Sequence, residues 1–225
     1  MVADRYAGAG RRAQWAKGWA WLVLCLAVAL PQAWATPPAK AAAQRTVLVY
    51  GDSLSAGYGM PASQGWVALL DKRLAARKPG WTVANASISG ETTAGGVSRI
   101  AQVLQRVEPD VVVIELGAND GLRGLPLAQS RDNLQRMVQA SRRAGAKVLL
   151  VGMRMPPNLG KRYTEGFAAN YRAVAEAEGV ALLPFLLEPV AADRASFQDD
   201  NLHPTAAAQP RLLDHVWTSL EPLLD

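Results

Sequence analysis

Five short apolar runs alternate with longer amphipathic segments from Arg45 to the end of the chain. Glycine, proline, aspartate or asparagine bounds each run, a pattern that favours β-strands. The run Val-Val-Val-Ile at 111–114 is continuous rather than alternating, which is typical of a parallel strand covered on both faces. The predicted strands are Thr46–Tyr50, Trp81–Asn85, Val111–Leu116, Lys147–Gly152 and Val180–Phe185.

The segments between the runs carry apolar residues at helical spacing. Strand–helix alternation of this kind predicts a parallel sheet between two helical layers, that is, a three-layer α/β/α sandwich with a central five-stranded sheet. Ligands bind at the carboxyl ends of the strands in such sheets. The residues that mark the helices include Trp66, Leu70, Leu74, Ile100, Leu104, Leu134, Val138, Phe167, Tyr171, Leu213 and Val216.

The first 35 residues have the three parts of a secretory signal peptide. A basic stretch is followed by an apolar stretch from Gly18 to Leu30, and then by the small-x-small signature Ala33-Trp34-Ala35. We expect cleavage after Ala35, a linker over 36–44 and one globular domain over 45–225, with no stable membrane anchor. An uncleaved N-terminal anchor is the alternative, which the short apolar stretch disfavours.

Charge and cysteine content exclude several classes of function. The formal net charge is +5, but the leader contributes four basic residues against one acidic residue, so the rest of the chain is close to neutral. A nearly neutral domain lacks the excess of basic residues that is typical of nucleic-acid-binding proteins. Cys25, the one cysteine, lies inside the leader, so the exported protein has no thiol for a disulfide, a nucleophile or a metal. The localisation follows from the leader instead, which predicts a periplasmic or secreted protein.

A serine follows the first predicted strand directly, in Gly51-Asp52-Ser53-Leu54. A glycine permits a tight turn at this point, which would expose the Ser53 hydroxyl at the sheet edge. An Asp-Ser pair in a loop is more often only a turn or a helix cap. Ser53 can therefore be interpreted as a nucleophile only if another side chain is placed to accept its proton.

Two histidines follow the leader, His203 and His215. His215 falls within the apolar pattern of the last helix, so we interpret it as a helix residue near the surface. His203 lies in a loop, and Pro204 suits the first turn of the final helix. Asp200 is close enough for a turn to bring its carboxylate to the imidazole, where it would fix the tautomer and stabilise the imidazolium. Asp199 is the rival for this position.

Two further loops offer donors for an oxyanion. Gly90 is expected to open a helix, with its N–H pointing out of the positive helix end. Asn119 follows the most apolar strand, and its side-chain amide can reach the same space. The alternatives are a plain strand–helix turn at Gly90 and an Asx turn at Asn119. The catalytic interpretation is favoured because all four segments, those with Ser53, Gly90, Asn119 and His203, follow predicted strands and so lie at one edge of the sheet.

The four blocks resemble those of the SGNH (GDSL) hydrolases, in the same order: Gly-Asp-Ser-Leu with Ser53, then Gly90, Gly-x-Asn-Asp with Asn119, and Asp-x-x-His with His203. Within this family, the chain is most similar to the periplasmic multifunctional thioesterase I/lysophospholipase/arylesterase group of Gram-negative bacteria. The resemblance implies a flavodoxin-like fold, a triad completed by Asp200, and an oxyanion hole from the Ser53 and Gly90 N–H groups and the Asn119 amide. It also implies two-step hydrolysis of esters and thioesters without a metal or cofactor.

The loops over 121–126 and 153–160 carry apolar residues beside the proposed site. They are predicted to line an acyl groove, although packing onto neighbouring helices is the alternative. We expect a monomer acting on a small-molecule acyl ester or thioester. The second candidate function is that of a carbohydrate O-deacetylase, for which Tyr58 is the nearby residue that could stack on a sugar. The third is that of a noncatalytic lipid carrier. The predicted groove residues are Leu122, Leu125, Met155 and Leu159.

Overall fold

A five-stranded parallel sheet organises residues 44–225, the part of the chain that the computed structural model describes. The strand order is β2-β1-β3-β4-β5, and every neighbouring pair is parallel. This confirms the predicted sheet, and each predicted strand overlaps an observed one. The strands are β1 (Arg45–Gly51), β2 (Trp81–Asn85), β3 (Val111–Glu115), β4 (Lys147–Val151) and β5 (Ala181–Leu183).

The two central strands are apolar on both faces, as a covered parallel sheet requires. All five residues of β3 are buried, and so are the last five of β1. Their register pairs Val47 with Val111 and Tyr50 with Ile114. The one acidic residue among them is Glu115, which ends β3 and has no exposed surface.

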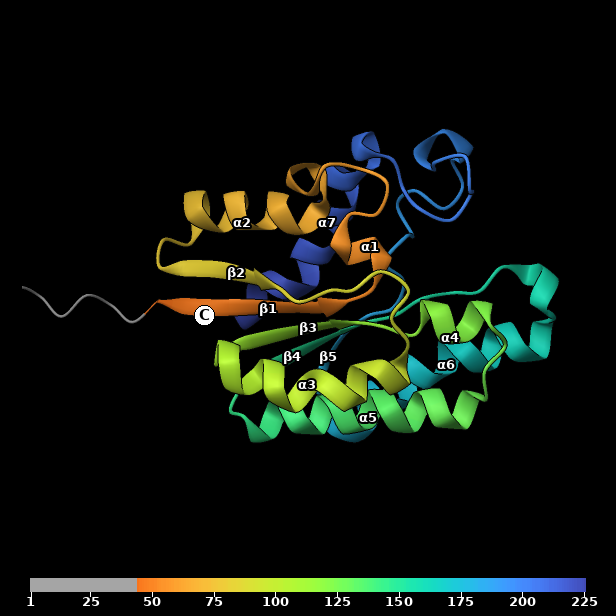
Figure 1. Cartoon of the computed structure of the whole chain (residues 1–225), viewed down its shortest axis with the longest axis horizontal. Coiled ribbons are helices and arrows are strands. Elements are labelled where there is room, and N and C mark those ends of the chain that lie inside the picture. Colours follow the sequence, from red (N-terminus) through yellow and green to blue (C-terminus); the bar gives the residue numbers. More distant parts are fainter. Residues whose placement is uncertain (1–43) are drawn as a thin grey trace, which may run out of the picture. The chain divides into compact units, whose positions relative to one another are not determined.

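Helices cover both faces of the sheet, which confirms the three-layer α/β/α architecture (Figure 1). The helices α2 (Trp66–Arg77) and α7 (Gln209–Leu220) pack on one face. The helices α3 (Thr93–Val107), α5 (Leu127–Arg143) and α6 (Lys161–Glu178) pack on the other. Within residues 44–225, no helix has the length and apolar content needed to cross a membrane.

Two short helices lie at the carboxyl ends of central strands, α1 (Ser53–Ala56) after β1 and α4 (Ala118–Leu122) after β3 (Figure 1). Connecting segments also contain single turns of 3-10 helix. These turns are η1 (Ala62–Gln64), η2 (Pro157–Leu159), η3 (Arg194–Ser196), η4 (Ala206–Ala208) and η5 (Glu221–Leu223).

Two predicted helix starts were wrong. Pro204 does not lie in the first turn of the last helix, because it pairs with Phe197 in an antiparallel bridge. Pro210 lies in the first turn of α7 instead. Gly90 lies in a turn with φ +79°, outside α3, because Thr92 caps that helix by accepting a hydrogen bond from a backbone N–H of its first turn.

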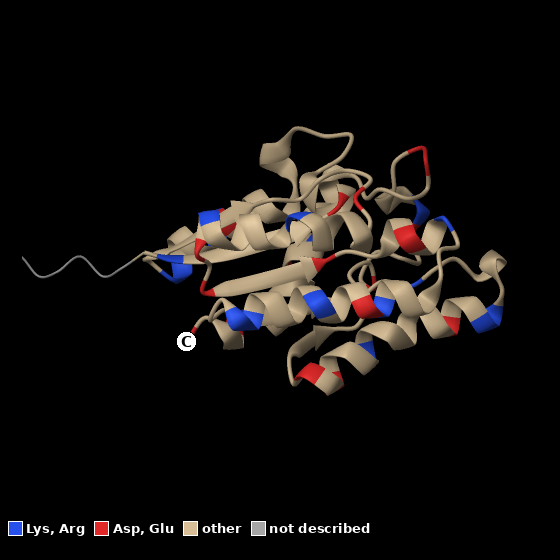
Figure 2. Ribbon diagram, turned by 60° about the horizontal axis from the view of Figure 1, so that its bottom comes forward, with Lys and Arg blue, Asp and Glu red and all other residues tan. Residues whose placement is uncertain are grey.

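Charges of both signs are interspersed over the helices (Figure 2). Some of them pair across the surface, for example Arg73 with Asp214 at 2.5 Å. The predicted signal peptide over 1–35 lies outside the described residues. So does the predicted linker over 36–44, apart from its last residue.

Candidate active site

Ser53 lies at the carboxyl end of β1, where it begins α1. Asp52 caps this helix, because its carboxylate accepts a hydrogen bond of 3.0 Å from the backbone N–H two residues further on. Gly57 ends the helix with φ +77°, a conformation that favours glycine. Gly51 allows the chain to pass close to β3, since a Cβ there would lie 2.7 Å from a carboxylate oxygen of Glu115. These local features present the serine at the sheet edge, as the sequence predicted.

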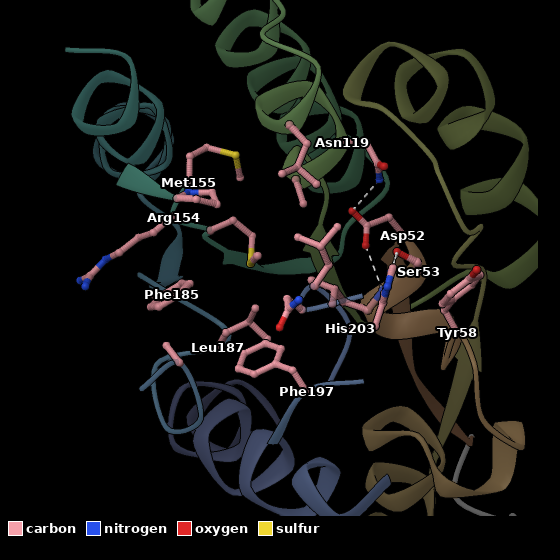
Figure 3. Close-up of a pocket in the computed structure, with 18 of the residues that line it drawn as sticks. Asp52, Ser53, Tyr58, Asn119, Arg154, Met155, Phe185, Leu187, Phe197 and His203 are labelled. Carbon is pink, nitrogen blue, oxygen red and sulfur yellow. Dashed lines mark hydrogen bonds between the residues drawn. The ribbon is translucent and has the colours of Figure 1, made fainter. Parts of the chain in front are cut away.

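Ser53, His203 and Asp200 form a continuous hydrogen-bonded series. Figure 3 shows Ser53 and His203 side by side at the cavity. The Ser53 Oγ lies 2.8 Å from His203 Nε2, and His203 Nδ1 lies 2.6 Å from Asp200 Oδ2. The other carboxylate oxygen of Asp200 accepts the backbone N–H groups of Leu202 and His203, at 2.9 and 3.0 Å. Asp200 therefore forms the turn and faces the imidazole at the same time.

The protonation state of the His203 imidazole follows from the charge of the Asp200 carboxylate. Hydrogen bonds, above all that from the backbone N–H of His203, lower the pKa of Asp200 to about 2. An ionised carboxylate only accepts hydrogen bonds, so Nδ1 of the imidazole carries the proton towards Asp200. The Nε2 atom is then left to accept the hydroxyl proton of Ser53. This is the tautomer that a general base requires.

The loop around His203 is fixed by neighbouring side chains. The Tyr58 ring centroid lies 4.4 Å from that of the imidazole. The Gln198 side-chain amide donates to the carbonyls of Tyr58 and Pro204, at 2.9 and 3.1 Å. It therefore joins the loop after β1 to the loop that carries the histidine.

His215 and Asp199 take no part in the series. The ring Nε2 of His215 is hydrogen-bonded to the carbonyl of Phe185 at 3.0 Å, so this half-buried residue joins α7 to the loop after β5. The Asp199 side chain is exposed. Within residues 44–225, there is no group of three or more His, Cys, Asp or Glu side chains that could hold a metal ion.

The predicted oxyanion-hole residues Gly90 and Asn119 line the same cavity as Ser53. The side-chain amide of Asn119 donates to the Asp52 carboxylate at 3.1 Å and to the Glu91 carbonyl at 3.0 Å. The Gly90 carbonyl accepts a hydrogen bond from Arg123, at 3.2 Å. The three residues named for the oxyanion hole are thus brought together beside the serine hydroxyl.

The cavity beside Ser53 has a volume of about 520 Å³ and a largely apolar lining (Figure 3). Of the four predicted groove residues, Leu122 and Met155 line it, whereas Leu125 and Leu159 do not. The backbone carbonyl of Leu125 accepts a hydrogen bond from the Tyr163 hydroxyl at 3.1 Å. Leu159 lines a separate hollow next to α6.

Several cavity residues were missed by the sequence reasoning. They lie on the loops after β4 and β5, both at the predicted edge, but nothing in their local pattern shows which way their side chains turn. Arg154 lies over the ring of Phe185, at 5.1 Å from its centroid. Met153 belongs to the loop over 153–160 that was predicted to line the groove, although it was not named itself. The missed apolar residues are Phe185, Leu187 and Phe197.

Two buried acids, Asp52 and Glu115, lie next to Ser53, where β1 and β3 end. Burial raises the pKa of Asp52 to about 6. Burial, followed by the nearby charge of Asp52, raises the pKa of Glu115 well above its ordinary value. The Glu115 Oε2 atom accepts the Ser55 hydroxyl at 2.7 Å, while Oε1 has no partner within the described residues. Of the two acids, Glu115 therefore holds a proton more readily, and Asp52 is the one that ionises first.

A serine hydroxyl bonded to an imidazole, which is in turn oriented by a carboxylate, is the geometry of a serine hydrolase. The model of the GDSL-like Lipase/Acylhydrolase family matches residues 49–210. The chain belongs to this family.

Named relatives cover most of the chain. It is 55% identical over 183 residues to esterase TesA of Pseudomonas aeruginosa, covering 81% of this chain and 91% of the relative. It is 42% identical over 186 residues to thioesterase 1/protease 1/lysophospholipase L1 of Escherichia coli K12, covering 83% of this chain and 88% of the relative. The solved structure of the psychrotrophic esterase EstA from Pseudoalteromonas sp. matches with a TM-score of 0.77 and 39% identity, over 80% of this chain and 98% of that one.

Proposed function

We propose that this protein cleaves carboxylic ester and acyl thioester bonds through an acyl-enzyme intermediate. The observation that carries the proposal is the series of hydrogen bonds from Ser53 through His203 to Asp200, at 2.8 and 2.6 Å, beside an apolar cavity. The names of the relatives, esterase, thioesterase and lysophospholipase, support the same reaction class.

In the first step, Ser53 Oγ attacks the acyl carbonyl carbon and His203 Nε2 accepts the hydroxyl proton. The Asp200 carboxylate stabilises the imidazolium that forms. The Ser53 and Gly90 N–H groups and the Asn119 amide donate to the oxyanion. When the carbon–oxygen or carbon–sulfur bond breaks, the imidazolium gives its proton to the leaving alcohol or thiol.

In the second step, His203 removes a proton from water, which attacks the ester carbonyl of the acyl-enzyme. The tetrahedral intermediate then expels Ser53 Oγ, which recovers its proton from the imidazolium. The free carboxylic acid leaves, and the resting hydrogen bonds form again. Over the whole cycle, the proton given to the leaving group is replaced by the one that His203 takes from water.

The substrate class follows from the cavity. We propose that the acyl chain lies along apolar side chains such as Leu122, Met155 and Leu187, so that chains of medium length react faster than acetate. We further propose that the chain is exported to the periplasm or secreted after cleavage behind Ala35, and that it acts as a monomer.

A panel of p-nitrophenyl esters from acetate to palmitate, with an acyl-CoA series for thioesters, tests the proposal. Turnover that rises from acetate to medium chains would support it. A preference for acetate alone would favour a deacetylase, and binding without turnover would favour a lipid carrier. Ser53→Ala should lose several orders of magnitude in kcat with an unchanged melting temperature. Near-normal turnover by this variant would refute the serine mechanism.

A further inference from the structure

The side-chain amide of Asn119 is fully engaged in the substrate-free protein. Its nitrogen has two hydrogens, and it donates to the Asp52 carboxylate at 3.1 Å and to the backbone carbonyl of Glu91 at 3.0 Å. An oxyanion can therefore be bound only if one of these two hydrogen bonds is exchanged.

The two partners differ in strength. A hydrogen bond to an ionised carboxylate is roughly twice as strong as one between neutral groups. Asp52 is also fixed in place, because it is wholly buried and its other oxygen caps α1 through the backbone N–H of Leu54. The bond to the neutral carbonyl of Glu91 is the weaker one, so it is the bond that a developing oxyanion displaces.

Asp52 also decides which end of the amide faces the nucleophile. If the Asn119 amide were flipped, its oxygen would face both the Asp52 carboxylate and the Glu91 carbonyl, and every contact would set acceptor against acceptor. A flipped amide would in addition present an acceptor to the oxyanion. The carboxylate therefore excludes the orientation that cannot stabilise the transition state.

We infer that Asp52 is a positioning residue for the oxyanion hole: its carboxylate keeps one N–H of Asn119, and the other N–H passes from the Glu91 carbonyl to the oxyanion. The inference rests on the proposed serine-hydrolase function and assigns the aspartate a role beyond capping α1. The competing role is a direct electrostatic effect of Asp52 on the imidazolium of His203, whose charge favours the ionised form of this aspartate.

A double-mutant cycle between Asp52→Ser and Asn119→Ala separates the two roles. Serine is a good N-cap, so it keeps the start of α1 but is too short to hold Asn119. Asp52→Asn is the second variant, in case the first does not fold: asparagine has one acceptor oxygen for the two donors that the carboxylate serves. Asp110→Asn is the matched control, because Asp110 accepts a backbone N–H from Thr46 at 2.7 Å, before β3 and at the opposite end of the sheet.

The readouts are kcat and KM for p-nitrophenyl butyrate, with melting temperatures for every variant. Each of the two single substitutions should lower kcat by about 10²- to 10³-fold, the loss expected for one oxyanion donor, while KM changes by less than about threefold. The double variant should be no worse than Asn119→Ala by more than about threefold. The Asp110 control should keep its kcat.

Losses that multiply in the double variant would overturn the inference in favour of the direct effect on His203. A kcat close to that of the wild type in a folded Asp52→Ser or Asp52→Asn protein would overturn it as well. Neither result would touch the proposed function, which fails only if the wild type does not hydrolyse esters or if Ser53→Ala remains active.

Discussion

Leu122→Ser should weaken the preference for longer acyl chains while leaving the cleavage of acetate esters nearly intact. Leu122 ends α4, lines the cavity and is 42% exposed in the substrate-free protein. An acyl chain in the cavity would cover this surface, whereas an acetyl group is too short to extend along it. The substitution removes apolar contact from the groove without opening a cavity in the core.

The size of the effect can be estimated from the area that the acyl chain covers. A fully buried methylene contributes about 0.8 kcal/mol, and one lying against a single wall of an open groove contributes about half of that. If two to three methylenes contact Leu122, the variant loses about 0.8–1.2 kcal/mol of binding in the transition state. This corresponds to a fall of about four- to eightfold in kcat/KM for decanoate relative to acetate.

Leu125→Ser is the matched control, because Leu125 lies three residues further on, in the same loop region, but outside the cavity. The assay compares kcat/KM for p-nitrophenyl acetate, butyrate and decanoate in the wild type and both variants. The decanoate-to-acetate ratio should fall only for Leu122→Ser. An equal fall in both variants, or an unchanged ratio in Leu122→Ser, would show that the acyl chain does not pass along α4.

Three further predictions concern other parts of the chain. His203→Ala should lose several orders of magnitude in kcat. His215→Ala should lose at most a few-fold in kcat, together with about 1 kcal/mol of stability from its hydrogen bond to the Phe185 carbonyl. Equal losses of kcat in the two variants would refute the assignment of His203 as the base. Folded Glu115 keeps a proton that the unfolded chain releases, so the free energy of unfolding falls by about 1.4 kcal/mol per pH unit between the ordinary and the raised pKa. In urea titrations from pH 5 to 8, Glu115→Gln should remove this contribution. A free energy of unfolding that changes with pH equally in the wild type and in Glu115→Gln would contradict it. N-terminal sequencing of the exported protein should begin at Thr36, and a retained leader would contradict cleavage after Ala35.

The sheet could be predicted from the sequence because its strands are defined locally. Continuous β-branched runs such as that of β3 and their bounding glycine or aspartate residues mark the strands without knowledge of their neighbours. The start of the last helix could not be predicted in this way. Pro204 suits a helix start by itself, but Phe197 pairs with it across the loop, and that contact is not visible in the local pattern.

The hydrogen-bonded series was predictable for a different reason. With two histidines after the leader, and one of them within a helical apolar pattern, few choices of base remained for Ser53. The cavity lining was only half predictable. The apolar content of a loop indicates that its side chains are covered, but it does not show whether a bound acyl chain or a neighbouring helix covers them. Leu122 faces the cavity whereas Leu125 is directed elsewhere, and this difference depends on how α4 packs against the neighbouring loops.

The buried acids behind Ser53 were not predictable as a pair, because Asp52 and Glu115 are 63 residues apart in sequence and meet only through the pairing of β1 with β3. Two carboxylates in one buried site do not both ionise readily. Asp52 accepts hydrogen bonds from the Leu54 backbone and the Asn119 amide, while Glu115 accepts one short bond from Ser55 and a longer one, of 3.4 Å, from the Asp52 backbone. The negative charge is therefore better stabilised on Asp52, and the proton stays on Glu115. Because the charge lies on the acid that contacts Asn119, the strong acceptor is present where the amide that we propose for the oxyanion hole has to be oriented.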